Sequence, residues 1–341
     1  MKSKVEQIQQ LLLKPRKIVL IGHINPDGDT VGCALALAFF LRKKGHQCQV
    51  LIPDNIEYTL MWMPEVRQIT IYKKDPEQAK AYIADADVIF CVDFSNLERT
   101  GDMKKFILEN TKAPRILIDH HLNPNIEEFD LVISTQNTSS TAELIYNILK
   151  IFNEPELFDK EIATVLYVGI ITDTGALSYS CENTSVYQVI AELVDMGINT
   201  QQIRTNLYNM LPESRLRITG YALFAKMKII KPSRTAYIVL TQDELHNMRY
   251  QKGDTEGLVN YCISMYNIVF GCIIIEQIDC VKLSFRSRGD FDVSRFATQH
   301  FGGGGHKNAS GGTSYVSLDE TVKKFETVLQ QYKKELVGIV I

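Results

Sequence analysis

The chain has 341 residues, of which 45% are hydrophobic and 23% are charged, and its formal net charge is −3. This is the composition of an ordinary globular protein, and the length predicts two domains. The small net charge excludes binding of nucleic acid through overall charge, so any site for a polyanion is local. The N-terminus has no signal-peptide core and no apolar run is long enough to cross a bilayer, so we expect a cytoplasmic protein without membrane contact.

The cysteines limit the type of protein further. No two of them form a CxxC pair, and most lie in apolar segments, which predicts small core residues in a reducing compartment. This pattern disfavours a cysteine-based zinc site. The seven cysteines are Cys33, Cys48, Cys91, Cys181, Cys262, Cys272 and Cys280.

Apolar periodicity predicts alternating strands and helices over the first 190 residues. The expected strands cover residues 17–21, 49–52, 69–72, 87–93 and 115–121. The expected helices cover residues 33–41, 76–84, 103–110, 141–152 and 160–171. Strands separated by helices indicate a parallel sheet with helices on both faces.

The pattern then becomes continuously helical to about residue 215, and residues 213–227 carry no strand signal. Beyond it we expect strands at 235–240, 267–275 and 281–286 and helices at 243–249, 293–300 and 318–332. The chain is therefore predicted to be an α/β protein. Its parts are a first domain over residues 1–192, a helical linker over 193–215 and a smaller α/β domain over 216–341.

A turn rich in chemistry-bearing side chains follows the first strand. The dipeptides Asn25-Pro26 and Asp27-Gly28 force a tight turn that carries His23, Asp27 and Asp29 between a strand and a helix. In open parallel sheets this edge is where ligands bind. On these residues alone, helix capping by the two aspartates is an equal alternative.

Three more acidic clusters follow apolar segments, at Asp93, at Asp119-His120-His121 and at Asp173. We expect all four clusters to end strands and to share one edge of the sheet. Carboxylates this close repel one another unless a cation lies between them. The set suits two divalent metals with a bridging carboxylate, which activate water for displacement at phosphorus. Oxygen and nitrogen ligands without cysteine favour Mn²⁺, with Mg²⁺ or Co²⁺ as alternatives.

These clusters resemble the four motifs of the DHH phosphoesterase superfamily. The stretch Gly302-Gly-Gly-Gly-His306-Lys-Asn-Ala-Ser-Gly311 resembles the substrate motif of the DHH-associated C-terminal domain. Chain length and the strand end Phe285-Arg286-Ser287 are most similar to the nanoRNase/pAp phosphatase branch, the bacterial bifunctional oligoribonucleases. This resemblance implies a catalytic DHH domain with a dinuclear metal site, a substrate-binding second domain and an active site in the cleft between them.

The resemblance also implies roles for individual residues. The first metal would be held by His23, Asp27 and Asp93. The second would be held by Asp29, Asp93, His120 and Asp173, so that Asp93 bridges the two ions and is catalytic. A catalytic His121 would contact the scissile phosphate or the leaving group, and Asp119 would orient a histidine from outside the ligand set.

Further residues are expected to bind substrate. The glycine run gives close backbone approach or a flexible turn, and Arg286 forms a phosphate clamp or a surface salt bridge. Ser140, just before the helix at 141, either faces the site or caps the helix. The expected substrate-binding set is Arg286, Gly303, Gly304, Gly305, His306, Ser310 and Ser140.

The implied activity is removal of mononucleotides from very short oligoribonucleotides, with dephosphorylation of 3′-phosphoadenosine 5′-phosphate (pAp) to AMP as a second reaction. The implied partners are short RNA or small phosphorylated nucleotides. The apolar residues 336–341 are also compatible with a homodimer. Rival enzymes are a linear or cyclic dinucleotide phosphodiesterase, a pyrophosphatase and an exopolyphosphatase. The rival from another class is a catalytically silent, nucleotide-binding regulatory protein.

Overall fold

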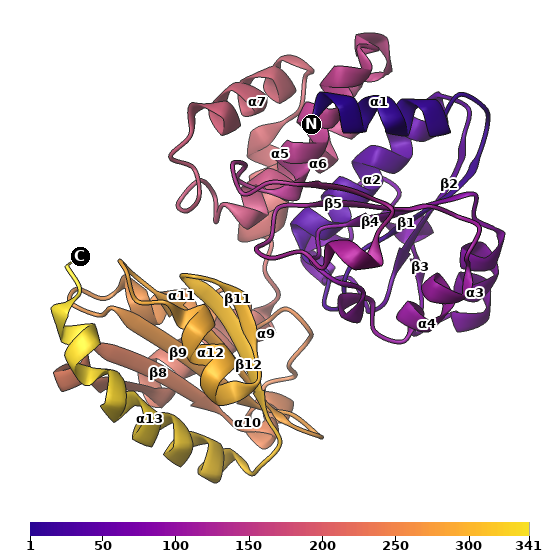
Figure 1. Cartoon of the computed structure of the whole chain (residues 1–341). Coiled ribbons are helices and arrows are strands. Elements are labelled where there is room, and N and C mark those ends of the chain that lie inside the picture. The colour runs from indigo at the N-terminus through magenta and orange to yellow at the C-terminus, as the bar shows by residue number, and fades with distance from the viewer. Residues whose placement is uncertain (341) are drawn as a thin grey trace. The chain divides into compact units, whose positions relative to one another are not determined.

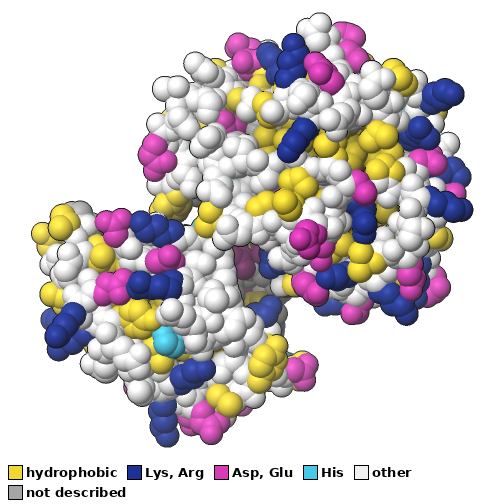
Figure 2. Space-filling view, in the orientation of Figure 1, with side chains coloured by type: hydrophobic (Ala, Val, Ile, Leu, Met, Phe, Trp, Pro, Cys, Tyr) yellow, Lys and Arg dark blue, Asp and Glu magenta, His cyan; other side chains and the backbone are white. Residues whose placement is uncertain are grey.

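The computed structural model describes residues 1–340, which fold into two compact units with the chain boundary between Met210 and Leu211 (Figure 1). Most residues of the expected linker, 193–215, therefore pack with the first unit. Over the face shown in Figure 2, basic and acidic side chains are interspersed, in keeping with the small net charge. Within the described residues, no helix has the length and apolar character that crossing a bilayer requires.

The first unit contains a six-stranded, all-parallel sheet in the order β3-β2-β1-β4-β5-β6. Its strands are β1 (Lys17–Ile21), β2 (Gln47–Ile52), β3 (Thr70–Ile71), β4 (Val88–Val92), β5 (Arg115–Asp119) and β6 (Leu131–Ser134). The short strand β6 was not expected, although three of its four residues are apolar.

Helices cover both faces of this sheet, as expected, because side chains alternate along each strand. In β1, Ile18 and Leu20 pack into one core cluster, while Val19 and Ile21 pack into another. The first cluster contains side chains of α1 (Lys2–Leu11), α2 (Gly28–Lys43), α5 (Thr141–Phe152), α6 (Lys160–Asp173), α7 (Thr184–Asp195) and α8 (Thr200–Arg204). The second contains side chains of α3 (Pro76–Asp85) and α4 (Met103–Glu109).

The second unit contains a six-stranded mixed sheet in the order β11-β12-β10-β9-β8-β7, in which only β8 and β9 pair in parallel. Its strands are β7 (Met227–Ile230), β8 (Thr235–Leu240), β9 (Phe270–Glu276), β10 (Val281–Ser287), β11 (Gly304–His306) and β12 (Ala309–Ser314). Strand β7 begins at Met227, where the expected helical stretch ends, and was not expected, and β11 and β12 arise in the glycine stretch.

Helices again lie on both faces of the second sheet. A phenylalanine-rich cluster packs beneath α12 (Val293–Phe301) and α13 (Leu318–Gly338). An aliphatic cluster packs beneath α9 (Glu213–Tyr221), α10 (Gln242–Asn247) and α11 (Leu258–Ser264). Leu336 is buried in the first of these cores, and Ile341 lies outside the described residues, so the homodimer stays a prediction.

The seven cysteines are free thiols. Five of them are buried, as expected for small core residues, and only Cys181 and Cys280 are partly exposed. Burial raises the pKa of the Cys48 thiol to about 12, so this side chain stays protonated and unreactive at neutral pH.

Helices α2 and α6 cross at very short range because both carry glycine at the crossing. A Cβ added to Gly32 would lie 2.4 Å from the carbonyl oxygen of Val165, and one added to Gly169 would lie 2.5 Å from Ala142 Cβ. Backbone rather than a mobile side chain blocks the space at Gly32. The crossing therefore depends on the missing side chain.

We predict that Gly32→Ala lowers the free energy of unfolding by about 1–3 kcal/mol, because α2 and α6 must move apart. Denaturant unfolding of the full chain measures this loss. The matched control is Gly220→Ala in α9, where an added Cβ meets nothing within 4 Å. There we expect a neutral or slightly stabilising change, of up to about 1 kcal/mol, from helix propensity. Equal changes in the free energy of unfolding for the two substitutions contradict the inference that α2 and α6 pack too closely for a side chain at Gly32.

Glu244 joins three segments of the second unit. It forms a capping box with Thr241 at the start of α10 and accepts hydrogen bonds from Tyr221 Oη at 2.6 Å and Lys226 Nζ at 2.7 Å. Burial raises the pKa of Glu244, but the hydrogen bonds from Lys226, Thr241 and Tyr221 outweigh it and lower the pKa to about 2. Folding therefore favours the ionised carboxylate.

Because the folded-state pKa of Glu244 lies below its usual 4.5, its contribution is complete above that pH and is lost as pH falls toward 2. We predict that Glu244→Gln is less stable than the wild type at neutral pH, and that the difference narrows steadily as the pH falls toward 2. Thermal unfolding across this pH range measures the gap. Glu256→Gln, at an exposed site in the same unit, is the control and should show no such narrowing. A stability difference between wild type and Glu244→Gln that does not change with pH contradicts a stabilising role of the ionised Glu244 carboxylate.

Candidate metal centre

The acidic clusters meet at the carboxyl edge of the central strands of the first sheet. His23 follows β1, Asp93 follows β4, and Asp119 ends β5, and these three strands are neighbours. The expectation that every cluster ends a strand is wrong for Asp173, which is the last residue of helix α6. The helix itself was expected over residues 160–171, so the error was to group its end with the strand ends.

The turn after β1 combines the two roles that the sequence left open. Asp27 caps α2, since its Oδ1 accepts the Thr30 N–H at 3.0 Å, while its Oδ2 lies 3.9 Å from His23 Nε2. His23 Nδ1 lies 2.6 Å from the Ile24 carbonyl oxygen, which places the ring proton on Nδ1 and leaves Nε2 as a lone-pair donor. The same aspartate therefore serves as cap and as candidate ligand.

Asp93 occupies the centre of the cluster. Its Oδ2 lies 3.6 Å from His23 Nε2, and its Oδ1 lies 3.9 Å from His120 Nε2. The residue is 2% exposed and adopts a left-handed backbone conformation, with φ of 67°. Such a conformation costs energy for a residue with a Cβ and is maintained by the surroundings. It directs the carboxylate between two histidines instead of along the strand.

The second side of Asp93 faces Asp29, His120 and Asp173. His120 Nε2 lies 3.4 Å from Asp173 Oδ2. Asp29 is 1% exposed, and its carboxylate accepts the N–H groups of Thr141 at 2.7 Å and Ala142 at 2.9 Å. These N–H groups belong to the first turn of α5, where helical partners are absent.

Asp119 and His121 form a separate pair. His121 Nδ1 lies 2.7 Å from Asp119 Oδ1, so the fully buried carboxylate orients the ring and turns Nε2 away from itself. The expected orienting role of Asp119 requires such a contact, and the role itself stays a prediction. The other oxygen, Asp119 Oδ2, is buried without a hydrogen-bond partner among the described residues.

The electrostatics of the cluster favour a bound cation. Burial, followed by the charges of Asp93, Asp173 and Asp27, raises the pKa of Asp29 well above its usual range. Burial also raises the pKa of Asp93, but the nearby His23, His121 and His120 outweigh it and lower this pKa. Burial lowers the pKa of His121, but Asp119 and Asp93 outweigh it and raise it to about 9. The raised pKa of Asp29 reflects a carboxylate without a nearby cation, and a bound metal ion would favour its ionised form.

The candidate ligand atoms fall into overlapping groups, each within 4.8 Å. One group is His23, Asp27 and Asp93, another is Asp29, Asp93 and His120, and a third is Asp93, Asp119 and His121. Asp93 belongs to all three. Nitrogen and oxygen donors without sulfur match a divalent metal of the Mg²⁺ or Mn²⁺ type. These residues can therefore hold a metal ion.

Two threonines in the cluster were not predicted. Thr30 Oγ1 donates to Asp93 Oδ2 at 2.6 Å, and Thr141 Oγ1 donates to Asp93 Oδ1 at 2.9 Å. The sequence signal was the hydroxyl-rich run that ends at Thr141, where the expected contributor was Ser140. Instead Ser140 is fully buried and caps α5 by accepting the Glu143 N–H at 3.1 Å.

The expected substrate residues of the second unit lie in the β-hairpin of β11 and β12 and on the neighbouring strand β10. In the strand pairing, Gly304 lies opposite Gly311, Gly305 opposite Ser310, and Arg286 opposite Ala309. His306 ends β11, and Ser310 Oγ is buried without a hydrogen-bond partner among the described residues. Arg286 Nη1 donates to its neighbouring carbonyl of Phe285 at 3.0 Å. Ligand binding by these residues stays a prediction.

The glycines of this hairpin have a structural reason of their own. A Cβ on Gly303 would lie 1.9 Å from the carbonyl oxygen of Gly311, and Gly305 has φ of +146°. Both positions exclude a side chain because one backbone approaches another. The stretch is therefore an ordered hairpin, whereas the sequence alone also allowed a flexible turn.

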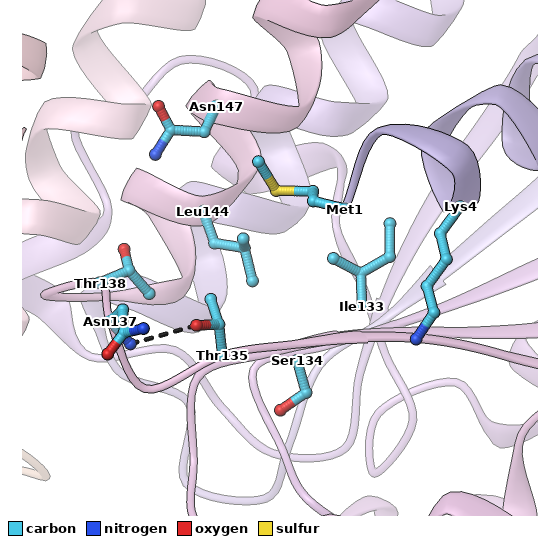
Figure 3. A pocket seen from close by; sticks show the side chains of 9 residues that line it. All are labelled: Met1, Lys4, Ile133, Ser134, Thr135, Asn137, Thr138, Leu144 and Asn147. Carbon is cyan, nitrogen blue, oxygen red and sulfur yellow. Dashed lines mark hydrogen bonds between the residues drawn. The ribbon is translucent and has the colours of Figure 1, made fainter.

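A cavity of about 430 Å³ lies elsewhere in the first unit, beside β6 and the start of α1 (Figure 3). Its lining residues are Met1, Lys4, Ile133, Ser134, Thr135, Asn137, Thr138, Leu144 and Asn147. None of them is a candidate metal ligand, so this cavity is distinct from the metal cluster.

Comparison with known families gives two matches in chain order. A model of the DHH family, N-terminal domain, matches residues 17–170, and a model of the DHHA1 domain matches residues 236–336. All candidate metal ligands except Asp173 lie within the first match, and the glycine-rich hairpin lies within the second.

Full-length relatives agree with these matches. The Bacillus subtilis protein named bifunctional oligoribonuclease and PAP phosphatase NrnA is 24% identical over 321 residues, 93% of this chain and 96% of the relative. The crystal structure of an exopolyphosphatase-related protein from Bacteroides fragilis is 37% identical, with a TM-score of 0.94 over 99% of this chain and 98% of that chain. RecJ of Thermus thermophilus in complex with Mn²⁺ shares the fold, with 13% identity and a TM-score of 0.55 over 98% of this chain and 54% of that chain. The chain therefore belongs to the DHH family, with a DHHA1 domain after its DHH domain.

Proposed function

We propose that this protein is a metal-dependent phosphohydrolase that releases mononucleotides from short oligoribonucleotides and converts pAp to AMP. The observation that carries this proposal is Asp93, whose two carboxylate oxygens face two different groups of ligands. The relatives named for oligoribonuclease and PAP phosphatase activity, which match nearly the whole chain, support the choice of substrates.

Two divalent ions fit the ligand set best, and Mn²⁺ is our proposal for both, with Mg²⁺ or Co²⁺ as substitutes. His23, Asp27 and Asp93 would hold one ion, and Asp29, Asp93, His120 and Asp173 would hold the other. Such a pair activates water and stabilises the attacking and leaving oxygens at phosphorus. The Mn²⁺ complex of RecJ, a protein of the same fold, supports this choice of metal.

The remaining residues would bind and orient the substrate. His121, with its Nδ1 held by Asp119, has Nε2 for a phosphate or leaving-group oxygen. In the second domain, Arg286 would clamp a phosphate in bidentate fashion, and the hairpin of Gly303, Gly304, Gly305, His306 and Ser310 would hold the terminal nucleotide. A substrate that spans both domains, and a cytoplasmic location, stay predictions.

A second candidate is polyphosphate hydrolysis, because the Bacteroides fragilis relative is titled exopolyphosphatase-related. The test is one substrate panel with Mn²⁺: pAp, RNA dimers to pentamers, linear and cyclic dinucleotides, pyrophosphate and polyphosphate. We expect the highest kcat/KM on pAp and the shortest RNAs. Faster turnover of polyphosphate supports the second candidate. Tight pAp binding without turnover of any substrate would make the protein a nucleotide-binding regulator.

Asp93→Asn is the direct test of the centre. The amide keeps the size of the side chain but removes the charge that both ligand groups share, so we predict a loss of kcat of at least about 1,000-fold, on the scale of a lost catalytic electrostatic group. Calorimetry with Mn²⁺ should show weakened binding at both sites. Circular dichroism checks that the fold is retained. Wild-type turnover from a folded Asp93→Asn protein contradicts the proposal.

Arg286→Ala separates substrate binding from chemistry. We predict that KM for short RNA rises about 10- to 100-fold, on the scale of a lost charge-assisted contact, while Mn²⁺ affinity is unchanged. The control is Arg295→Ala, which removes an exposed guanidinium that pairs with Glu335. Steady-state kinetics measures KM for short RNA, and calorimetry measures Mn²⁺ affinity, for both variants. Equal KM for Arg286→Ala and the wild type excludes Arg286 from the substrate site.

A further inference from the structure

Two threonines make the same pair of contacts on opposite sides of Asp93. Each lies in the first turn of a helix, each is fully buried, and each donates once from its backbone N–H and once from its hydroxyl. Both acceptors are carboxylates of candidate metal ligands. The two threonines are Thr30 in α2 and Thr141 in α5.

Thr30 connects the carboxylates that face His23. Its N–H donates to Asp27 Oδ1 at 3.0 Å, and its Oγ1 donates to Asp93 Oδ2 at 2.6 Å. The same Oδ2 lies 3.6 Å from His23 Nε2. Thr30 therefore contacts two of the three residues of the first ligand group.

Thr141 connects the carboxylates on the other side. Its N–H donates to Asp29 Oδ2 at 2.7 Å, and its Oγ1 donates to Asp93 Oδ1 at 2.9 Å. The same Oδ1 lies 3.9 Å from His120 Nε2. Thr141 therefore contacts two residues of the second ligand group, so each threonine connects the shared Asp93 to a different aspartate.

Hydrogen bonds to carboxylates are stronger than neutral ones and restrict the position of the acceptor. A carboxylate oxygen has more than one lone pair, so each donated bond orients the oxygen and leaves it able to bind a cation. Asp93 needs this restraint more than an ordinary residue, because its left-handed backbone is strained and its carboxylate is flanked by other acids. Two hydroxyls, one on each oxygen, hold it between the two groups.

We propose that Thr30 and Thr141 are positioning residues with divided duties: Thr30 sets the geometry of the first metal site and Thr141 that of the second. The inference rests on the proposed function and deepens it, because it assigns each oxygen of the shared Asp93 to one ion. Removal of one hydroxyl should then lower the binding affinity for one ion more than for the other.

The test uses Thr30→Val and Thr141→Val, which remove the hydroxyl and keep both the side-chain shape and the backbone N–H. Titration calorimetry of the metal-free full chain with Mn²⁺ measures both sites, and Asp27→Asn and Asp29→Asn identify them, since each should empty a different one. We expect Thr30→Val to weaken the first site and Thr141→Val the second, each about 10- to 100-fold, the range for residues that orient metal ligands. Thr30→Ser and Thr141→Ser should restore the affinity.

Thr321→Val in the second unit is the matched control, because it is fully buried and its hydroxyl donates to Ser314 Oγ at 2.8 Å, with no metal ligand involved. It should lower the melting temperature without any change in Mn²⁺ affinity. If a valine variant fails to fold, Thr30→Ala or Thr141→Ala takes its place. Unchanged affinities in a folded variant, or equal weakening of both sites by each variant, overturn the inference. A wild-type chain that binds no divalent ion overturns the proposed function itself.

Discussion

The carboxylate of Asp93 is the constraint on which the rest of the first unit depends, because one buried side chain faces two ligand groups. Strand order satisfies this constraint: β4 lies between β1 and β5, so the turn after β1 and the histidines after β5 approach Asp93 from opposite sides. In a parallel sheet all three strands end at the same edge. The left-handed backbone at Asp93 then turns the carboxylate into the space between its neighbours.

Helix packing supplies the ligands that the strands do not. A Cβ on Gly169 would lie 2.8 Å from Asp29 Oδ1 as well as 2.5 Å from Ala142 Cβ. The glycine therefore lets α6 approach both α2 and α5, and the end of α6 brings Asp173 beside His120. The same close packing stabilises the fold and completes the site. A substitution that separates these helices would affect both.

Much of this arrangement was predictable from the sequence, because chemistry-bearing residues followed strand signals. His23, Asp93 and His120 were placed correctly at one edge, since each follows a short apolar run and parallel strands end together. Asp173 was wrongly grouped with the strand ends, although the helix before it was expected over residues 160–171. Strand β7 and the glycine hairpin were missed because pairing with neighbouring strands, and not local propensity, determines them. Thr30 and Thr141 were missed because their acceptors are distant in sequence.

The proposed pair of divalent ions can be compared with the negative charge of the cluster. Four carboxylates, Asp27, Asp29, Asp93 and Asp173, match the charge of two such ions, while Asp119 contacts His121. A phosphate group of the substrate therefore adds negative charge that the cluster does not neutralise. With the proposed ions and substrate, a cation outside the ligand set would be needed, because buried charge is costly when unpaired. Arg99, exposed and with its Nη2 3.4 Å from His23 Nδ1, places a guanidinium at the rim of this cluster.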